Sequence, residues 1–336
     1  MSLPWSRVHL IAATEATRAH LTLRIDTSRQ VDPFAALDVA GVLVFRRRLD
    51  HLAGLYLPPA PQEGRAVAAV LINVVHPSSK QRFTAAHELG HHLRDQAISF
   101  DTDTEWLGRG EGPVTDRERL AEAFAAWFLM PKRLVLSTLG FLGLSTDTLS
   151  ADGAYALSLE LGTSYAATVR HLVDMRLLSS KHSEQLLTVP PQTIKQEIAG
   201  PGVTADAWKD VHRVRVSRST ADSDLKVAVL EGDAVVLEVP ETPSSGYLWQ
   251  LPAAPAGLAL MRDEYQALDG DALGGRGWHR FLFRVEASGH FDMVLEMRRP
   301  WQRGTAAQTA HVAVTARPQP TSGIVQPGLL VAAVAA

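Results

Sequence analysis

The sequence predicts a chain of the α+β class, in which a mixed N-terminal domain is followed by an all-β, immunoglobulin-like sandwich. Helical periodicity, with apolar residues three and four apart, runs from about residue 80 to residue 187. Beyond Pro190-Pro191 and the stretch 200–202, apolar and polar residues alternate with period two, as in half-buried strands. We therefore expect domains at residues 1–200 and 201–320 and a tail at 321–336, in keeping with the length of 336 residues.

The composition excludes several classes of function. The 33 Lys and Arg residues against 36 Asp and Glu give a formal charge of −3, which disfavours a nucleic-acid-binding surface as the main activity. The absence of cysteine removes disulfides, thiolate metal sites and cysteine nucleophiles, so any metal must be held by His, Asp or Glu. Residues 1–24 do not resemble a secretory signal, and the apolar tail is too short to span a membrane. We expect a cytoplasmic protein without a membrane partner.

The N-terminal domain is expected to begin with three short strands, separated by turn residues and followed by a helix that starts near Ser79. A polar loop over 101–113 then leads to a second helix that ends before Pro131, and further helices continue to about residue 187. The expected strands are 41–46, 52–57 and 67–75, and the two expected helices are 80–96 and 116–130.

The first of these helices carries the motif H-E-x-x-H at residues 87–91. Because an α-helix has 3.6 residues per turn, His87 and His91 project from one face and can bind the same zinc ion. Glu88 lies beside them and can take a proton from the attacking water, while zinc polarises a peptide carbonyl. The motif therefore predicts a metal-dependent peptidase site, with His87 and His91 as ligands and Glu88 as the catalytic base.

A catalytic zinc ion needs a third protein ligand. The metzincin pattern does not supply it, because Arg94 and Ala97 stand where that pattern requires glycine and histidine. The next helix offers Glu118 and Glu122, four residues apart on one face. From the residues alone, both glutamates remain candidates.

The stretch 81–93, followed by Glu118 and by Phe-Ala-Ala-Trp-Phe-Leu-Met-Pro at 124–131, resembles the ImmA/IrrE metallopeptidases. The resemblance selects Glu118 as the third ligand, thirteen residues before Pro131, and it implies zinc, with manganese as an alternative. A glutamate, Glu122, stands where that family often has asparagine, which leaves Glu122 as a lesser candidate. The family implies limited cleavage of a helix-turn-helix transcription repressor in a stress or DNA-damage response.

Three further residues are candidates for substrate binding. Asn73 matches a position common in that family and lies at the end of the strand before the H-E-x-x-H helix. An edge strand there could pair with an extended substrate. Alternatively, the Asn73 side chain is an amide that caps a turn. Tyr165 and His171 belong to a helix-turn-helix-like part at about 150–187 and could face the cleft. That part also permits a DNA-binding regulator, although its second helix offers only Arg170 and His171 as contacts. We favour a helical subdomain that completes the peptidase.

The C-terminal domain is expected to be an antiparallel sandwich of seven or eight short strands. Its aromatic residues Tyr247, Trp249 and Phe281 are expected in the core. The expected strands are 211–216, 225–230, 234–239, 247–250, 258–262, 278–285, 291–297 and 309–314.

Three loops of this domain resemble the inhibitory loops of the chagasin-like cysteine peptidase inhibitors. They are Thr-Pro-Ser-Ser-Gly-Tyr at 242–247, the glycine-rich segment 273–277 and Arg-Arg-Pro-Trp at 298–301. Thr242 replaces the usual asparagine. The resemblance implies that the loops lie together at one end of the sandwich and bind a protein. The residues expected to contact that partner are Pro243, Ser244, Ser245, Gly246, Tyr247, Gly275, Arg299, Pro300 and Trp301.

Two functions follow from these patterns. The first is a zinc-dependent endopeptidase whose C-terminal domain senses a signal or recognises the substrate. The second is a protein-binding or cysteine-peptidase-inhibitor module in which the metal site is secondary. Glu88 favours the first, because a structural metal site needs no base beside its ligands.

Overall fold

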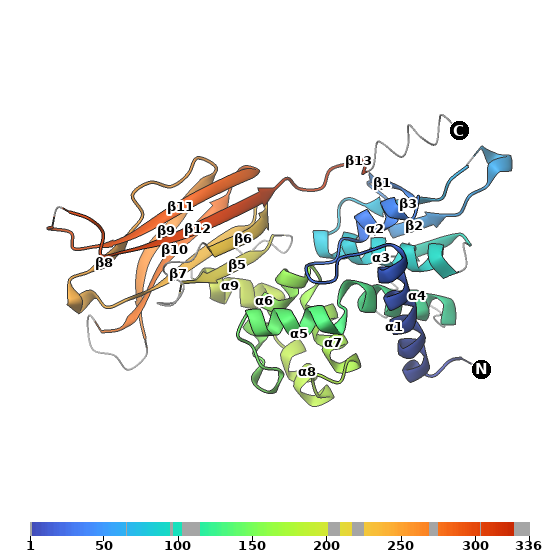
Figure 1. Ribbon diagram of the computed structural model, residues 1–336, viewed down its shortest axis with the longest axis horizontal. Helices are drawn as coiled ribbons and strands as arrows, with labels where there is room; N and C mark the ends of the chain where they lie inside the picture. Colours follow the sequence, from blue (N-terminus) through green and yellow to red (C-terminus); the bar gives the residue numbers. More distant parts are fainter. Residues whose placement is uncertain are drawn as a thin grey trace. The chain divides into compact units, whose positions relative to one another are not determined.

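The computed structural model describes residues 2–64, 66–94, 97–102, 115–200, 209–216, 225–268, 275–302 and 304–325. The chain forms two compact units (Figure 1). The first comprises Met1–Pro190 together with Pro320–Ala336, and the second comprises Pro191–Gln319. Among the helices of the described residues, none combines the length and the apolar character that crossing a bilayer requires.

The first unit combines helices with one five-stranded sheet. Its helices are α1 (Trp5–Thr22), α2 (Pro33–Val39), α3 (Ser78–Arg94), α4 (Asp116–Leu129), α5 (Lys132–Phe141), α6 (Ala151–Leu161), α7 (Tyr165–Asp174) and α8 (Ser180–Leu187), with short 3-10 turns at Pro61–Glu63 and Thr146–Thr148. Its strands are β1 (Leu43–Arg47), β2 (Leu52–Leu57), β3 (Ala69–Asn73), β4 (Ser99–Thr102) and β13 (Gly323–Ile324).

The strand order in this sheet is β13-β1-β3-β2-β4. β1 and β3 are parallel, whereas the other neighbouring pairs are antiparallel. Helix α3 packs against β2 and β3 (Figure 1). The expectation that Asn73 ends an edge strand is wrong: β3 pairs with β1 on one side and with β2 on the other, so its backbone is already hydrogen-bonded. The edge strand nearest in sequence to the H-E-x-x-H helix is β4.

Helices α3 and α4 approach each other closely at Gly90. A Cβ atom built on Gly90 would lie 2.9 Å from Cδ1 of Phe124, so a larger residue would push the two helices apart. The start of α4 is fixed by Thr115, whose hydroxyl accepts a hydrogen bond from the backbone N–H of Glu118 at 3.3 Å. The close contact and the cap together place the first turn of α4 beside the last turns of α3.

The helix-turn-helix-like part consists of α6, a turn of three residues and α7. Gly162 ends α6 in the left-handed conformation with φ of 65°, a backbone conformation that glycine adopts without strain. On α7, His171 is buried, so Arg170 is the one basic side chain of that helix exposed to solvent.

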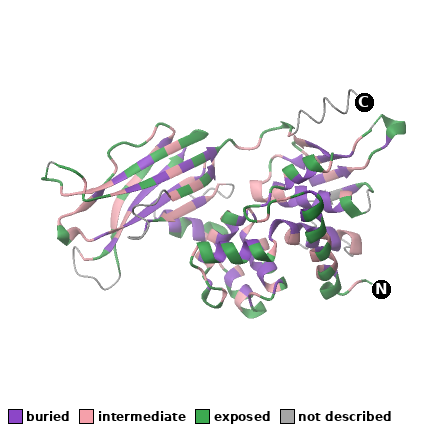
Figure 2. Cartoon of the chain, in the orientation of Figure 1, coloured by how far each residue is buried: buried purple, intermediate pink, exposed green. Residues whose placement is uncertain are grey.

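The second unit is a sandwich of two four-stranded sheets, with orders β5-β7-β10-β9 and β6-β12-β11-β8. Buried and exposed residues alternate along its strands (Figure 2). Its elements are α9 (Pro191–Ala199), β5 (Val211–Arg215), β6 (Leu225–Leu230), β7 (Ala234–Glu241), a 3-10 turn at Pro243–Ser245, β8 (Leu248–Gln250), β9 (Leu258–Ala267), β10 (Gly277–Val285), β11 (Gly289–Arg298) and β12 (Gln308–Arg317).

The predicted α+β class and the all-β C-terminal sandwich are confirmed, and each of the eight expected sandwich strands is present. The expectation of a purely antiparallel sandwich is wrong, because β5 pairs with β7 and β6 pairs with β12 in parallel. Trp249 and Phe281 lie in the core as expected. Tyr247 does not, because its ring is only partly buried and lies under the guanidinium group of Arg299, 4.5 Å from the ring centroid. A cation–π contact of this kind needs one ring face outside the apolar core.

Several elements differ from the sequence-based expectation. Helices α1 and α2 and strand β4 were not expected, and part of the expected tail forms β13 beside β1. Helix α9 belongs to the second unit rather than to the first, because Ile194 and Ile198 are buried there and the carbonyl oxygen of Ile198 accepts a hydrogen bond from Arg280. The two units therefore meet in sequence at Pro190-Pro191, ten residues before the expected position.

Candidate metal centre

Two histidines of α3 form one side of the candidate metal centre. His87 and His91 stand one helical turn apart, and their Nε2 atoms approach to 3.1 Å. The ring planes are inclined by 67°, and both side chains are almost completely buried. The helical spacing of the motif therefore places two ring nitrogens within reach of one ion, as the sequence predicts.

Glu118, in the first turn of α4, supplies the third group. Its Oε2 atom lies 3.3 Å from Nε2 of His87 and 3.2 Å from Nε2 of His91. Partial burial by itself raises the pKa of Glu118, but the hydrogen bonds and charges of the two histidines outweigh burial and hold that pKa far below its usual value. The carboxylate is therefore ionised at neutral pH, as a metal ligand must be.

The three atoms fit a divalent cation. Ligand atoms bound tetrahedrally about 2.0 Å from zinc lie about 3.3 Å from one another. The distances of 3.1, 3.2 and 3.3 Å between the two Nε2 atoms and Oε2 match that value. Among the described residues, no other group of three His, Asp or Glu side chains brings its ligand atoms together in this way. Two imidazoles and one carboxylate leave a further coordination position for water or substrate, as in catalytic zinc sites.

Glu88 lies in the same helical turn as His87 and is completely buried. Its Oε2 atom accepts a hydrogen bond from the hydroxyl of Ser99 on the edge strand β4, at 3.3 Å. Gly54 on β2 leaves the space for this carboxylate, because a Cβ there would lie 2.3 Å from Cγ2 of Thr84 and 3.1 Å from Oε1 of Glu88. Sequence reasoning missed Ser99 and Gly54, because the pairing of β4 with β2 places Ser99 and the packing of α3 on β2 gives Gly54 its role.

Asn73 is used as a turn-capping amide. Its side-chain N–H groups donate to the carbonyl oxygens of Leu49 and Leu52 at 2.8 and 2.7 Å, and its Oδ1 atom accepts from the backbone N–H groups of Leu49 and Val75. The residue is almost completely buried and braces the turn between β1 and β2. These contacts favour the structural alternative and give a substrate-binding role no support.

Tyr165 and His171 also make internal hydrogen bonds. The Tyr165 hydroxyl donates to the carbonyl oxygen of Leu186 at 2.7 Å, and burial raises the pKa of Tyr165 to about 12. His171 shares a hydrogen bond of 3.2 Å with the carbonyl oxygen of Met130 and packs edge-on against Trp127. The structure does not bring either ring into the group of ligand atoms.

Two of the three predicted partner-binding loops, 242–247 and 298–301, lie against each other. Pro243, Ser244 and Ser245 form a 3-10 turn that ends at Gly246, and the Trp301 indole covers this turn: a Cβ on Gly246 would lie 2.9 Å from its Cη2. Trp301 is 72% exposed. Arg299 lies over Tyr247 and precedes the exposed Pro300. Gly275, two residues before the start of β10, accepts a hydrogen bond from Tyr265, while residues 273 and 274 lie outside the described part.

Comparisons with known proteins support both parts of the sequence-based recognition. Residues 37–140 match the family model of the IrrE N-terminal-like domain, a peptidase family. Residues 228–316 match the model of the chagasin family peptidase inhibitor I42. The chain thus joins a metallopeptidase-type domain to a chagasin-like domain. A search of curated proteins found no match.

Similar solved structures align with about a third of the chain. The cysteine protease inhibitor EhICP2 from Entamoeba histolytica is 18% identical, with a TM-score of 0.29, and the alignment covers 35% of this chain and 100% of that one. Amebosin is 22% identical, with a TM-score of 0.26 and coverages of 32% and 98%. PbICP-C, solved in complex with falcipain-2, is 15% identical, with a TM-score of 0.24 and coverages of 32% and 99%.

Proposed function

We propose that this protein is a zinc-dependent endopeptidase that cuts a partner protein at a limited number of bonds. The observation that carries the proposal is the convergence of His87, His91 and Glu118 within 3.3 Å, with Glu88 in the same helical turn. The match of residues 37–140 to a peptidase family supports the same reaction class. The partner that we propose is a helix-turn-helix transcription repressor whose cleavage forms part of a stress or DNA-damage response.

The reaction is hydrolysis of a peptide bond. A bound zinc ion would polarise the carbonyl group and lower the pKa of water, and manganese is the alternative ion. Glu88 would take one proton from the attacking water as the C–O bond forms, and would pass it to the leaving nitrogen as the C–N bond breaks. The Ser99 hydroxyl, which donates to Glu88, would hold the carboxylate in place during both transfers.

The proposal is tested in cells of the native host under basal and stress conditions. Protein termini are compared between cells that express this chain and cells that express a Glu88→Ala variant, with metal content and abundance of the two proteins matched. We expect one repressor-like protein to be cut at one bond only when Glu88 is present, and more strongly under stress. Identical termini in both cells, with folded and metal-loaded protein, would contradict the proposal.

A second candidate function rests on the loop cluster of the sandwich. Trp301 is largely exposed although it is a large aromatic residue, and it lies against the turn at Gly246. Exposed aromatic anchors on rigid turns are common at the centre of protein interfaces. Together with the match of residues 228–316 to a family of peptidase inhibitors, this arrangement supports binding of a protein, with a papain-type cysteine peptidase as the first partner to test.

The second candidate is tested with the full chain and a papain-type peptidase. Replacement of a central aromatic anchor by alanine weakens binding by about thirtyfold or more, so Trp301→Ala should raise the inhibition constant by that factor. Met261→Ala is the matched control, because Met261 is also an exposed apolar residue of the second unit. If the intact chain does not inhibit at micromolar concentration, or if both variants behave alike, these loops do not act as an inhibitor of this enzyme class.

A further inference from the structure

The first turn of α4 places the metal ligand Glu118 between two arginines in the sequence, Arg117 and Arg119. Consecutive residues of an α-helix point about 100° apart, so the three side chains leave this turn in different directions. The Oε2 atom of Glu118 lies 3.2 and 3.3 Å from the two histidine rings of α3. The two arginines instead bind other segments of the first unit, so one helical turn joins those segments to the metal ligand.

Arg117 binds the residues that lead into the edge strand β4. Its Nη2 atom donates to the carbonyl oxygen of Ala97 at 2.7 Å, and its Nη1 atom donates to that of Ile98 at 3.1 Å. The planar guanidinium group can hold two acceptors at once in a fixed geometry. Ile98 directly precedes Ser99, whose hydroxyl donates to Glu88. One arginine therefore joins the turn that carries a metal ligand to the strand that holds the proposed base.

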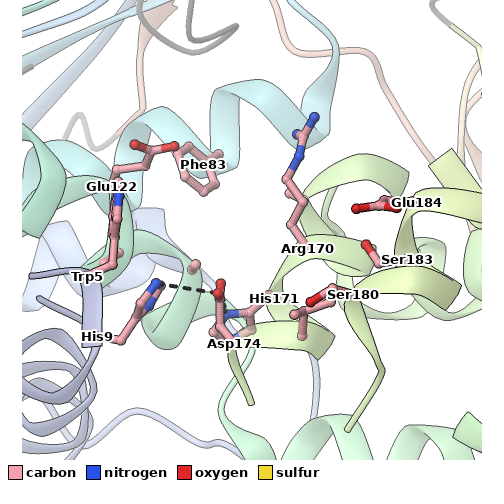
Figure 3. Close-up of a pocket in the computed structure, with 14 residues that line it drawn as sticks. Trp5, His9, Phe83, Glu122, Arg170, His171, Asp174, Ser180, Ser183 and Glu184 are labelled. Atoms are coloured by element: carbon pink, nitrogen blue, oxygen red, sulfur yellow. Dashed lines mark ion pairs between the residues drawn. The ribbon is translucent and has the colours of Figure 1, made fainter. Parts of the chain in front are cut away.

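Arg119 binds the N-terminal segment. Its Nη1 atom donates to the carbonyl oxygen of Leu3 at 2.7 Å and to Oδ1 of Asp116 at 2.9 Å, and Asp116 also accepts from the backbone N–H of Leu3. The guanidinium carbon lies 4.2 Å from the ring centroid of Trp5, which also lines a pocket of about 500 Å³ between α1, α4 and α7 (Figure 3). These contacts hold the first turn of α4 without the help of Arg117, so a substitution at Arg117 should not unfold that turn.

Strand β4 lies at one edge of its sheet and, among the described strands, pairs only with β2. Segments with few neighbours open locally, at a free energy below that of global unfolding. A contact at the start of β4 therefore changes how often this strand opens. Because Ser99 is the first residue of β4, each opening also removes the hydrogen bond that Glu88 accepts.

We propose that Arg117 is a positioning residue that couples metal binding at Glu118 to the order of strand β4. With Glu118 held in a metal site, the first turn of α4 is restrained, and the Arg117 guanidinium stays against the two carbonyl groups. Ser99 then remains in contact with Glu88, so metal loading also prepares the base. Because the coupling between two sites is reciprocal, an ordered β4 raises metal affinity by the same factor. The inference rests on the metal binding of the proposed function, but it does not require cleavage.

The coupling is tested by hydrogen–deuterium exchange of the full chain, with and without saturating zinc, in the wild-type and Arg117→Gln proteins. Glutamine is uncharged and has a single donor nitrogen, so it cannot hold both carbonyl groups as arginine does. Couplings between sites typically amount to about 5- to 150-fold, so zinc should slow exchange of wild-type residues 97–102 by about fivefold or more. In Arg117→Gln this slowing should disappear, whereas the slowing at α3 should remain because the three metal ligands are unchanged.

Zinc affinity gives an independent readout. In competition with a chromogenic chelator, Arg117→Gln should bind zinc more weakly than the wild type, by the factor of protection that β4 loses. Arg117→Lys keeps the charge and can reach one carbonyl group, so its response at β4 should be intermediate, and it keeps the test valid if Arg117→Gln is unstable. Arg133→Gln is the matched control, because Arg133 is an exposed arginine of α5, and it should behave like the wild type.

Several results would overturn the coupling. One is a wild-type protein in which zinc protects α3 but not β4, and another is an equal response of β4 to zinc in the wild-type and Arg117→Gln proteins. A loss of the zinc response at α3 as well as β4 in Arg117→Gln would make Arg117 a requirement of the whole metal centre rather than a link to one strand. An unchanged zinc affinity in Arg117→Gln, or the same losses in Arg133→Gln, would also contradict the proposal.

Cleavage separates this inference from the proposed function. A zinc response at β4 that depends on Arg117, without cleavage of any protein by the wild-type chain, would support the coupling and contradict the peptidase. Cleavage that depends on Glu88, together with an equal response of β4 in the wild-type and Arg117→Gln proteins, would support the peptidase and overturn the coupling. Cleavage that slows in zinc-saturated Arg117→Gln but not in Arg133→Gln, together with the Arg117-dependent response at β4, would support both.

Discussion

Each unit contains a cluster of histidine and carboxylate side chains, but the two clusters have opposite geometry. In the first unit, the Nε2 atoms of His87 and His91 and one oxygen of Glu118 point to a common centre. In the sandwich, the two ring nitrogens of His279 face different carboxylates. Its Nδ1 atom lies 3.1 Å from Glu241, and its Nε2 atom lies 2.6 Å from Asp263.

This difference shows that the direction of the ligand atoms, rather than the residue types, determines what a histidine cluster can do. An imidazole offers a metal only one nitrogen, and a second group normally orients the other. When carboxylates occupy both sides of the ring, as at His279, the cluster holds a proton instead of an ion. We therefore expect the first cluster to respond to metal and the second to respond to pH, and four experiments test that contrast.

The largest effect is expected at Glu88, because it distinguishes a catalytic metal centre from a structural one. Glu88→Gln keeps the size of the side chain and an oxygen that can accept from Ser99, but it removes the base. General base catalysis contributes about 10²- to 10⁴-fold, so the rate of peptide cleavage should fall by that factor while zinc content is unchanged. The rate is measured on the cleaved partner protein, with zinc determined by mass spectrometry. A variant that retains full activity would exclude Glu88 as the base.

The second effect concerns the choice between the two glutamates of α4. Replacing a residue that only orients a metal ligand lowers metal affinity by about 10- to 100-fold. Glu118→Ala removes a ligand itself, so it should weaken zinc binding by about 100-fold or more. Glu122→Ala is the matched control, one helical turn further along, and should bind zinc normally. Competition with a chromogenic chelator measures both affinities. Equal losses in the two variants, or a loss confined to Glu122→Ala, would overturn the assignment of Glu118.

The third effect separates the two units by their response to zinc. A ligand at one hundred times its dissociation constant stabilises the folded state by about 2.7 kcal/mol, because it does not bind the unfolded chain. Amides of α3 and α4 that exchange by unfolding of their unit should therefore exchange about 100-fold more slowly in zinc. Amides of β10, which carries His279, and of its neighbour β7 should not change. Hydrogen–deuterium exchange with mass spectrometry resolves these segments, and equal protection of both units would remove the proposed contrast.

The sequence predicted the parts of the molecule that depend on local periodicity. The spacing of H-E-x-x-H placed His87 and His91 on one face because a helix repeats every 3.6 residues. Period-two alternation likewise revealed the sandwich strands, whose inward residues form one core. The sequence did not predict helix α1, because its buried positions are mainly alanine, including Ala12 and Ala16, while Leu10 and Leu21 are exposed. Its apolar stripe is therefore weak.

Other features depend on contacts between distant segments and could not be predicted from local patterns. Glu118 and Glu122 share one face of α4, and the sequence alone did not distinguish them; the packing of α3 and α4 at Gly90 brings Glu118 to the histidines. The role of Asn73 depends on the path of the turn at Leu49, and β13 exists only through its pairing with β1. The metal-ligand roles of His87, His91 and Glu118 and the partner-binding roles of the sandwich loops remain predictions.

The smallest effect is expected at His279, and it tests whether the second cluster responds to pH. Burial lowers the pKa of His279, but the hydrogen bonds and charges of Glu241 and Asp263 outweigh burial and raise the pKa above its usual 6.5. A group whose pKa is higher in the folded state stabilises the fold fully below its unfolded pKa, and this stabilisation is lost as the pH rises through the folded pKa. The wild-type protein should therefore be more stable than His279→Gln in acid, and the difference should shrink as the pH increases from 6.5.

The expected change in the free energy of unfolding is no more than about 1 kcal/mol, because the Asp263 side chain is half exposed and solvent screens its charge. Urea unfolding of the wild-type and His279→Gln proteins between pH 5.5 and 8.5 measures it, within about two pH units of the free imidazole pKa. His290→Gln is the matched control, since His290 lies on an exposed strand position with its side chain 60% accessible. If the stability difference between the wild-type and His279→Gln proteins grows with pH, Glu241 and Asp263 do not hold a proton on His279. If that difference does not depend on pH, the cluster contributes hydrogen bonds but no change of charge. Either result would leave only the metal-binding part of the comparison between the two clusters. Glu241 also accepts a hydrogen bond from the backbone N–H of Trp249, so its carboxylate could support the loop cluster whether or not the His279 ring carries a proton.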